Sequence, residues 1–343
     1  MLVIPLFCIL KVIMMVNLRS LKWVFSGVTF ILVASILYLP SALGQTYPMK
    51  PIRLVVPYPA GSGTDIVART VGQKLSQQSG YSVVIDNRPG GGTIIGMDLV
   101  AKAIPDGYTL LMATTSLAIS PGLNDHLPFD PIRDFSPINL LDSAPLVLVT
   151  NPNLHITHVK DLIALAKNKP DELNYASSGN GGAIHLAMEL FKSMTNTRMN
   201  HIPFKGSPAA LLDVVAGRVS LMFNIISSST QHMASGKLRA LAVSGATRSA
   251  ALPNIPTVAE SGVPGYEAVS WHGLLAPAGT KSIIISELNR KIVYILRQPD
   301  VKETFQAQGF DIRGEDALKF GAFVRIEVAK WTQVVKHSNV RID

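Results

Sequence analysis

Short apolar runs alternate with amphipathic segments along most of the chain, and the clearest example begins at Ile52. Ile52 to Val56 is a mostly β-branched apolar run, which is typical of a buried strand. Prolines and glycines between Pro57 and Gly63 then free the backbone for a tight turn. Apolar residues recur every four positions from Val67, as on one face of a helix, and we expect Thr64 or Asp65 to cap that helix. This stretch predicts a strand, a loop of small residues and a helix start.

The same alternation continues toward the C-terminus. Further strands are predicted at residues 81–86, 108–113, 142–151, 174–178, 201–204, 219–223, 238–244 and 269–277. Helices are predicted near residues 94–103, 158–167, 184–194, 209–216, 282–297, 301–306 and 317–335. In the last helix an apolar stripe from Phe320 to Val335 is typical of core packing. Strands that alternate with helices indicate an α/β fold with a mostly parallel sheet covered on both faces.

Ligands of such sheets bind beyond the carboxyl ends of the strands, and small polar loops occupy several such places. The loop Tyr58–Asp65 follows the first strand, and Thr114–Ser116 and Ser177–Gly182 follow later ones. A helix that starts after such a loop offers unpaired N–H groups and a partial positive charge, and small residues let an anion come close to them. We therefore expect Tyr58–Asp65 to form half of a site for a small carboxylate.

Each of these loops also has a purely structural interpretation. Glycine-rich loops in α/β proteins are often only tight turns. A further glycine-rich loop, Arg88–Thr93, is interpreted as such a structural turn. Ser177 and Ser178 can serve as caps of the next helix, while His185, one turn into that helix, can cap or pack as well as bind. Asp65 is expected as an N-cap, because its carboxylate would repel an anionic ligand unless water or an ammonium group lay between them.

The first 44 residues have the pattern of a secretory signal peptide. Basic residues precede an apolar run, and Ala42-Leu43-Gly44 supplies a small-residue cleavage signal ahead of Gln45. The apolar run is long for this purpose, so an uncleaved membrane anchor is the alternative. A second apolar run in front leaves the translation start open between Met1 and Met14 or Met15. We expect export to the periplasm, with cleavage near Gly44/Gln45.

Composition narrows the chemistry that the chain can perform. The only cysteine, Cys8, lies in the leader, which removes thiol catalysis and cysteine zinc sites from the rest of the chain. The net charge of +8 is scattered, with no basic run that carries interleaved aromatics, so we expect no nucleic-acid binding. The histidines are spread singly, and nucleotide-binding, G-x-S-x-G and H-E-x-x-H motifs are absent. We therefore expect no catalysis, no metal and no cofactor.

A series of segments covers nearly the whole chain after the leader and occurs in the order of one family. The segments are Y-P-M-K-P-I-R-L-V-V-P-Y-P-A-G-S-G-T-D-I-V-A-R, V-I-D-N-R-P-G-G-G, L-P-F-D-P-I-R-D-F-S-P-I, S-S-G-N-G-G-A-I-H-L, H-I-P-F-K-G-S-P-A, G-K-L-R-A-L-A-V, I-P-T-V-A-E-S-G-V-P-G-Y-E and L-L-A-P-A-G-T. With these segments, the sequence resembles the Bug-type (Bordetella uptake gene) periplasmic solute-binding proteins of tripartite tricarboxylate transporters.

The resemblance implies the two-lobed type II periplasmic binding protein fold, an α/β fold whose ligand cleft between the lobes closes on an organic anion. The bounds that it implies are a signal peptide at 1–44, the first part of lobe 1 at 45–145, lobe 2 at 146–268, and a return segment of lobe 1 at 269–343. Members of the family mostly hold carboxylates with backbone amides, hydroxyls and ordered water. Trp271, at the return, either walls the cleft or packs in the core.

Carried over to this sequence, the resemblance and the loop pattern give one set of ligand-binding residues. The set is Tyr58, Pro59, Ala60, Gly61, Ser62, Gly63, Thr64, Asp65, Thr115, Ser116, Ser177, Ser178, Gly179, Gly181, His185 and Asn224. Ser62 stands where many members have glycine, and Asn224 stands where an acid is common. Both departures change the polar groups near the ligand, so the resemblance implies the class of ligand, a carboxylate, and no single compound.

Three hypotheses of different classes follow. The first is a monomeric periplasmic binding protein that captures a small carboxylate and delivers it to the membrane permease subunits of a tripartite tricarboxylate transporter. The alternative is a ligand-loaded sensor partner of a membrane signalling receptor, which would have the same fold. The third is a secreted hydrolase, which serines near His185 suggest, although no acid in the sequence is placed to orient that histidine.

Overall fold

The computed structural model describes residues 47–338 and residue 340. The chain divides after Met49 into two units, and the account that follows concerns the second, which starts at Lys50. The predicted signal peptide at 1–44, its cleavage near Gly44/Gln45 and the open choice of start at Met14 or Met15 lie outside the described residues. Of the helices within the described range, none combines the length and the apolar character needed to cross a membrane.

Helices and strands alternate through the described residues, as the apolar pattern predicts. The strands are β1 (Ile52–Val56), β2 (Val83–Asn87), β3 (Thr109–Thr114), β4 (Phe135–Thr150), β5 (Asn174–Ser177), β6 (Asn200–Pro203), β7 (Leu221–Ile225), β8 (Arg239–Val243), β9 (Val269–Pro277) and β10 (Asp311–Glu315). The helices are α3 (Gly63–Ser79), α4 (Ile94–Ala101), α5 (Thr115–Leu123), α6 (Val159–Asn168), α7 (Ala183–Thr195), α8 (Ser207–Val215), α9 (Ile226–Ala234), α10 (Ser282–Leu296), α11 (Pro299–Ala307) and α12 (Ala317–Ser338), with short 3-10 turns η1 (Gly91–Thr93) and η2 (Pro152–Leu154).

The strands form two groups that share β4. In the first group β1 runs parallel to β2 and β3, β9 runs antiparallel to β3, and β4 runs antiparallel to β9 and β10. In the second group β5 runs parallel to β6 and β7, while β4 runs antiparallel to β7 and β8. The sheet is therefore mixed, and the prediction of a mostly parallel sheet was wrong. The antiparallel pairs all involve β4 or β9, the two strands that link the groups.

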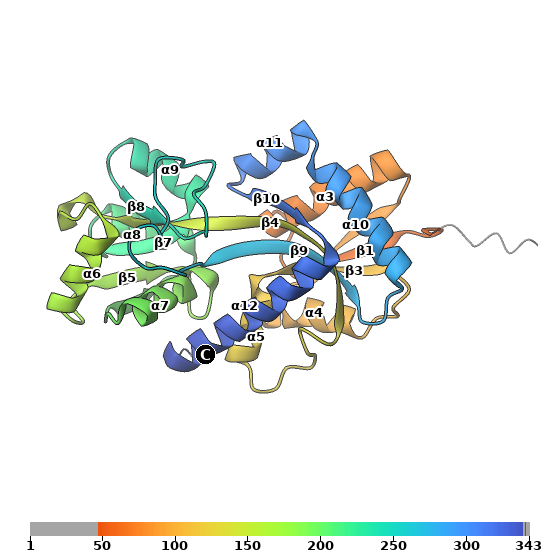
Figure 1. The fold of residues 1–343 in the computed structure, drawn as a ribbon, viewed down its shortest axis with the longest axis horizontal. Coiled ribbons are helices and arrows are strands. Elements are labelled where there is room, and N and C mark those ends of the chain that lie inside the picture. The colour runs from red at the N-terminus through yellow and green to blue at the C-terminus, as the bar shows by residue number, and fades with distance from the viewer. Residues whose placement is uncertain (1–46, 339, 341–343) are drawn as a thin grey trace, which may run out of the picture. The chain divides into compact units, whose positions relative to one another are not determined.

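Strand β4 changes its partners in the middle of its length. Its residues up to Pro145 pair with β9, and its residues from Leu146 onward pair with β7 and β8. Val269, the first residue of β9, lies directly opposite Pro145. Figure 1 shows β4 and β9 side by side between the two groups of strands. The chain thus leaves the first group at Pro145 and returns to it at Val269.

The C-terminal helix α12 covers one face of this linking region. Phe320 is fully buried, and its ring meets the indole of Trp271 on β9 edge-on at 5.8 Å between ring centroids. Trp271 also donates from Nε1 to the buried carboxylate of Glu327, at 3.2 Å. The predicted apolar stripe of α12 does form core, and Trp271 packs in that core, which settles the choice left open for it.

Candidate functional site

The loop after β1 is held in shape by the side chain of Asp65. Oδ2 of Asp65 accepts the backbone N–H of Gly61 at 2.8 Å and Nε of Arg69 at 2.8 Å, and Oδ1 accepts Nδ2 of Asn87 at 2.9 Å. Burial opposes ionisation of this carboxyl, but the hydrogen bonds from Arg69, Gly61 and Asn87 outweigh it and lower the pKa of Asp65. The carboxylate is therefore ionised and satisfied within the loop.

The N-cap of α3 is Ser62, so the prediction that Thr64 or Asp65 caps this helix was wrong. Ser62 has extended backbone angles, and its hydroxyl accepts the N–H of Asp65 at 3.2 Å. Asp65 lies in the first helical turn, where a negative charge interacts favourably with the helix dipole. Gly61, just before the cap, has a φ of +81°, a conformation that glycine adopts at little cost.

A second helix start lies beside this loop. Thr114 ends β3 and caps α5, accepting the N–H of Ser116 at 3.3 Å. The phenol of Tyr58 reaches over from the first loop and lies 2.8 Å from the hydroxyl of Ser116 and 3.1 Å from that of Thr114. Because β1 and β3 are parallel neighbours, α3 and α5 start at the same edge of the sheet. The structure thus brings together Tyr58, the loop and Ser116.

Thr115 points away from this group. Its hydroxyl accepts the backbone N–H of Trp271 at 3.0 Å and lies 3.5 Å from the carbonyl of Val269. The side chain is buried and joins α5 to β9. The structure therefore gives the Thr115 side chain a backbone partner, and its contact with a ligand stays a prediction.

The loop between β5 and α7 repeats the first arrangement with different support. The fully buried Ser177 hydroxyl lies 3.0 Å from the carbonyl oxygen of Gly179, 3.2 Å from its N–H, and 2.6 Å from Nε2 of His201. Gly179 and Gly181 both have positive φ, at +133° and +72°. Ser178 is half-buried at the turn itself. These residues form one compact turn at the N-terminus of α7.

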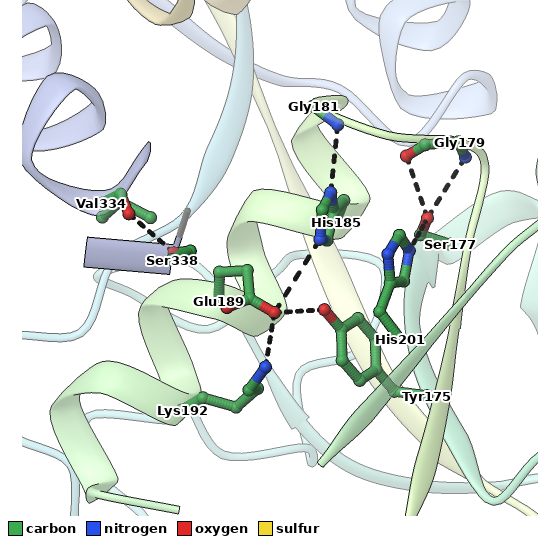
Figure 2. A network of polar contacts seen from close by, with 10 residues as sticks. All are labelled: Tyr175, Ser177, Gly179, Gly181, His185, Glu189, Lys192, His201, Val334 and Ser338. Atoms are coloured by element: carbon green, nitrogen blue, oxygen red, sulfur yellow. Dashed lines mark hydrogen bonds and ion pairs between the residues drawn. The ribbon is translucent and has the colours of Figure 1, made fainter. Parts of the chain in front are cut away.

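Two histidines lie stacked beneath this turn (Figure 2). Nδ1 of the buried His185 accepts the N–H of Gly181 at 3.0 Å, and its ring lies 3.7 Å from that of His201. His201 in turn stacks on Tyr175 at 4.9 Å. The structure thus favours the packing interpretation of His185, because the nitrogen nearest the loop is already bonded to the loop, and its contact with a ligand stays a prediction.

Glu189, one turn farther along α7, lies next to the same histidines. Its Oε1 accepts hydrogen bonds from the hydroxyl of Tyr175 and from Nζ of Lys192, and it lies 3.8 Å from Nε2 of His185. An acid therefore lies beside His185, at a position that the sequence analysis did not point to. A separation of 3.8 Å is too long for a hydrogen bond, and the carboxylate is already occupied by Tyr175 and Lys192, so it does not orient the ring for catalysis. His185 and Glu189 border a cavity of about 290 Å³.

Asn224 lies at the end of β7, the parallel neighbour of β5, and is fully buried. Its Oδ1 accepts the hydroxyl of Ser207 at the start of α8, and its Nδ2 donates to Ser229 in α9 at 2.9 Å. The amide thus ties two helices to the same edge of the sheet as the Ser177 loop. Its predicted effect on ligand selectivity is not tested by these contacts.

Several polar residues near these loops were not in the predicted set. They are Asn87, Thr114, Asp142, His201, Ser207 and His272. Asn87, Thr114 and Ser207 stand at the ends of predicted strands or at helix starts, and their positions alone would have pointed to them. Asp142, His201 and His272 act from within strands, where a single sequence gives no signal that separates them from ordinary polar positions.

Comparisons with known proteins agree with one another. The sequence profile of the family described as tripartite tricarboxylate transporter family receptor (TctC) matches residues 67–340. The chain is 38% identical to protein BugT of Bordetella pertussis over 302 residues, which cover 87% of this chain and 92% of BugT.

Two solved structures of relatives contain carboxylates. Rpa4515 of R. palustris, with adipate, is 35% identical to this chain. The aligned residues cover 86% of this chain and 99% of Rpa4515, and the two structures superpose with a TM-score of 0.71. MatC of Rhodopseudomonas palustris, with bound malate, is 28% identical. The aligned residues cover 84% of this chain and 100% of MatC, with a TM-score of 0.68. These matches confirm the predicted two-lobed α/β fold of periplasmic binding proteins.

Proposed function

We propose that this chain, which belongs to the TctC family of tripartite tricarboxylate transporter receptors, captures a small organic carboxylate in the periplasm and delivers it to membrane permease subunits. We further propose that residues 1–44 are a cleaved signal peptide and that the mature protein acts as a monomer. Its role is binding, without a chemical step and without metal or cofactor. Relatives that hold adipate and malate support the ligand class.

One observation carries the proposal. Two helix starts, those of α3 and α5, lie at one edge of the sheet with the hydroxyls of Tyr58 and Ser116 in contact between them. The one carboxylate of the loop, Asp65, is bonded to Gly61, Arg69 and Asn87, and so its charge is partly compensated. The edge therefore offers hydrogen-bond donors and a positive potential to an anion.

Lobe 2 supplies the opposite half of the proposed site. We propose lobes with bounds at 45–145, 146–268 and 269–343, which meet where β4 changes partners after Pro145. The contacts from lobe 2 would come from the turn at Ser177, Ser178, Gly179 and Gly181 and from Asn224. Each helix start contributes about 0.3–2 kcal/mol toward an anion. Micromolar binding needs about 8 kcal/mol, so hydrogen bonds and closure of the lobes must supply most of it.

A thermal-shift screen tests the function directly. Mono-, di- and tricarboxylates, with adipate and malate among them, are added to the purified protein. We expect at least one to raise the melting temperature by several degrees, because a ligand at about 100 times its Kd stabilises the folded state by about 2.7 kcal/mol. A screen in which no carboxylate shifts the melting temperature contradicts the proposed ligand class.

Two variants of equal bulk test the location. Ser178→Trp places an indole in the turn before α7 and should abolish the shift. Ser193→Trp makes the same change at an exposed position of α7 and should leave it intact. A full shift in the Ser178→Trp protein would count against the assigned site while leaving the ligand class standing.

The partner is tested separately. A ligand-loaded sensor that contacts a membrane signalling receptor would have the same fold and the same site. Crosslinking of the loaded protein to membranes of its own cells, followed by identification of the crosslinked protein, separates the two roles. A permease subunit supports the proposal, and a signalling receptor replaces it.

A further inference from the structure

A chain of three buried side chains runs from the linking strands to the first loop. Nδ1 of His272 on β9 lies 2.8 Å from Oδ1 of Asp142 on β4, and its Nε2 lies 3.1 Å from the hydroxyl oxygen of Thr64 in the first turn of α3. Thr64, His272 and Asp142 expose 7%, 6% and 0% of their surface. The proposed function assigns no role to His272 or Asp142.

The sheet places these side chains together. Asp142 and His272 lie directly opposite each other in the antiparallel pair of β4 and β9, so both point to the face that α3 covers. The pair lies three residues before Pro145, where β4 changes partners. Thr64 follows directly after Gly63, the first residue of α3, and so stands at the helix start proposed to hold the anion.

The direction of these hydrogen bonds depends on one proton. A carboxylate at Asp142 accepts at Oδ1, so Nδ1 of His272 carries a hydrogen and donates it, while Oδ2 is buried with no hydrogen-bond partner among the described residues. In the neutral ring Nε2 is then a bare acceptor, and it takes the single hydrogen of the Thr64 hydroxyl. In the charged ring Nε2 donates instead, and the Thr64 hydroxyl keeps its hydrogen for another acceptor.

We propose that His272 holds a proton whenever the cleft binds its carboxylate, and that this proton makes the Thr64 hydroxyl a donor to the ligand. The inference rests on the proposed function, because Thr64 must line the anion site. With a neutral ring Thr64 presents only lone pairs, which repel a carboxylate, and turning its hydrogen to the ligand would leave the buried Nε2 without a donor. Asp142 is a positioning residue, which orients the ring through the contact of its Oδ1 with Nδ1.

The charged groups around the pair are mostly acidic. On β10, Asp311 lies opposite Ser143, next to Asp142, and burial together with the Asp142 charge raises the pKa of Asp311. Arg313, farther along the same strand, has the opposite sign and forms an ion pair with Glu315.

The remaining neighbours contribute little charge. Asp65 follows Thr64 on α3, but its carboxylate is bonded to Gly61, Arg69 and Asn87. The ring of Phe310 meets that of His272 edge-on, with 5.1 Å between the ring centroids, and carries no charge. Asp142 is therefore the ionisable group in direct contact with the ring of His272.

Isothermal titration calorimetry tests the proposal with adipate and malate as probes, from about pH 6 to about pH 9. We expect the affinity to fall with rising pH, approaching tenfold per pH unit once the free protein has lost the proton that the complex retains. Asp142→Asn keeps the shape of the side chain and removes its charge, so the fall should move to lower pH. Titrations in buffers with different ionisation enthalpies should show uptake of up to one proton.

Two substitutions of Thr64 serve as matched variants. Thr64→Val removes the hydroxyl, and should weaken binding and remove this dependence on pH. Thr64→Ser keeps the hydroxyl, and should retain both the binding and the dependence. Melting temperatures of the free variants show that each is folded before it is titrated.

Two outcomes would overturn the inference about His272. The first leaves the proposed carboxylate function standing, and the second contradicts that function as well. Adipate or malate binding with a constant affinity across this pH range, in both the parent and the Asp142→Asn protein, removes the proton but leaves the carboxylate function standing. A protein that binds no carboxylate at any pH removes the proposed function, and this inference with it.

Discussion

In both candidate loops a buried side chain accepts a hydrogen bond from a backbone N–H of the loop and so holds its shape. Asp65 fixes the first loop through Gly61, and His185 fixes the second through Gly181. The sequence indicates both glycine-rich loops, because a strand followed by small residues and a helix start is a local pattern. It does not indicate which polar group closes each loop, and Ser62 rather than Thr64 or Asp65 caps α3 for this reason. The Asp65 carboxylate is bonded instead to partners that include Asn87, which is distant in sequence.

The support of the second loop by His185 should make the protein sensitive to acid. Burial, and after it the neighbouring His201, lowers the pKa of His185 to about 4, from an ordinary value of about 6.5. Between these values the unfolded chain binds a proton that the folded chain does not. The contribution of His185 to the free energy of unfolding is therefore fully present above about pH 6.5. It falls by about 3 kcal/mol as the pH drops to about 4.

Urea denaturation at about pH 7 and about pH 4.5 measures this loss. His185→Gln keeps an acceptor for the N–H of Gly181 but does not titrate, so the variant should lose less stability on acidification. His126→Gln changes an exposed histidine in the same way and should behave as the parent does. Equal acid sensitivity in all three proteins would show that His185 is not the group responsible.

At the scale of elements, long periodic segments were predicted well and irregular ones were not. The bounds of β9 match the expected 269–277, and those of α6, α7 and α10 lie within one residue of expectation. The sequence analysis missed α5, α9, β10 and the first half of β4. Helix α5 contains Pro121, and β10 is the polar run D-I-R-G-E, so neither has the apolar period on which the prediction depends. These elements are stabilised by tertiary contacts instead.

The contact of β9 with α12 gives a prediction at this scale. Gly273 lies beneath the ring of Phe320, and a Cβ at this position would overlap the ring. Gly273→Ala should therefore destabilise the protein by about 1–3 kcal/mol, as measured by chemical denaturation, because the helix must move away from the sheet. In a Phe320→Leu background the same substitution should cost less, since the smaller side chain leaves room.

A matched glycine provides the control. Gly182, at the start of α7, has a negative φ, and a Cβ there would meet only ordinary contacts, the nearest at 3.8 Å from the hydroxyl of Ser178. Gly182→Ala should change the free energy of unfolding by much less. A Gly273→Ala protein as stable as the parent would mean that α12 does not press on β9 in the way described.

At the scale of the whole molecule, the α/β class follows from local patterns, while the topology does not. The antiparallel pairing of β4 with β9 joins residues more than a hundred positions apart, and no periodicity encodes such a partner. Parallel pairing was expected because each strand–helix–strand unit favours it locally, and this holds for β1 with β3 and for β5 with β7. The resemblance to a family was needed to anticipate the return of the chain.

The return of the chain to the first group of strands at Val269 determines which segment can be removed from the protein. Pro145 and Val269 face each other across one antiparallel pair, and Ala268 donates to Ser244, which donates to Leu146. The proposed second lobe, residues 146–268, therefore begins and ends at one place. An Asn-Gly turn in its stead would close β4 and β9 into an ordinary hairpin.

We expect this shortened protein to fold cooperatively, with lower stability because α12 loses its contact with α7, and to bind no carboxylate. Circular dichroism and denaturation would show a folded α/β domain, and an unfolded product would mean that the first part depends on the second. Because the two ends of residues 146–268 are adjacent, this part of the chain can be exchanged as one unit. Recombination at this single junction could graft a different recognition half onto an unchanged scaffold, and so supply new specificities without rebuilding the protein.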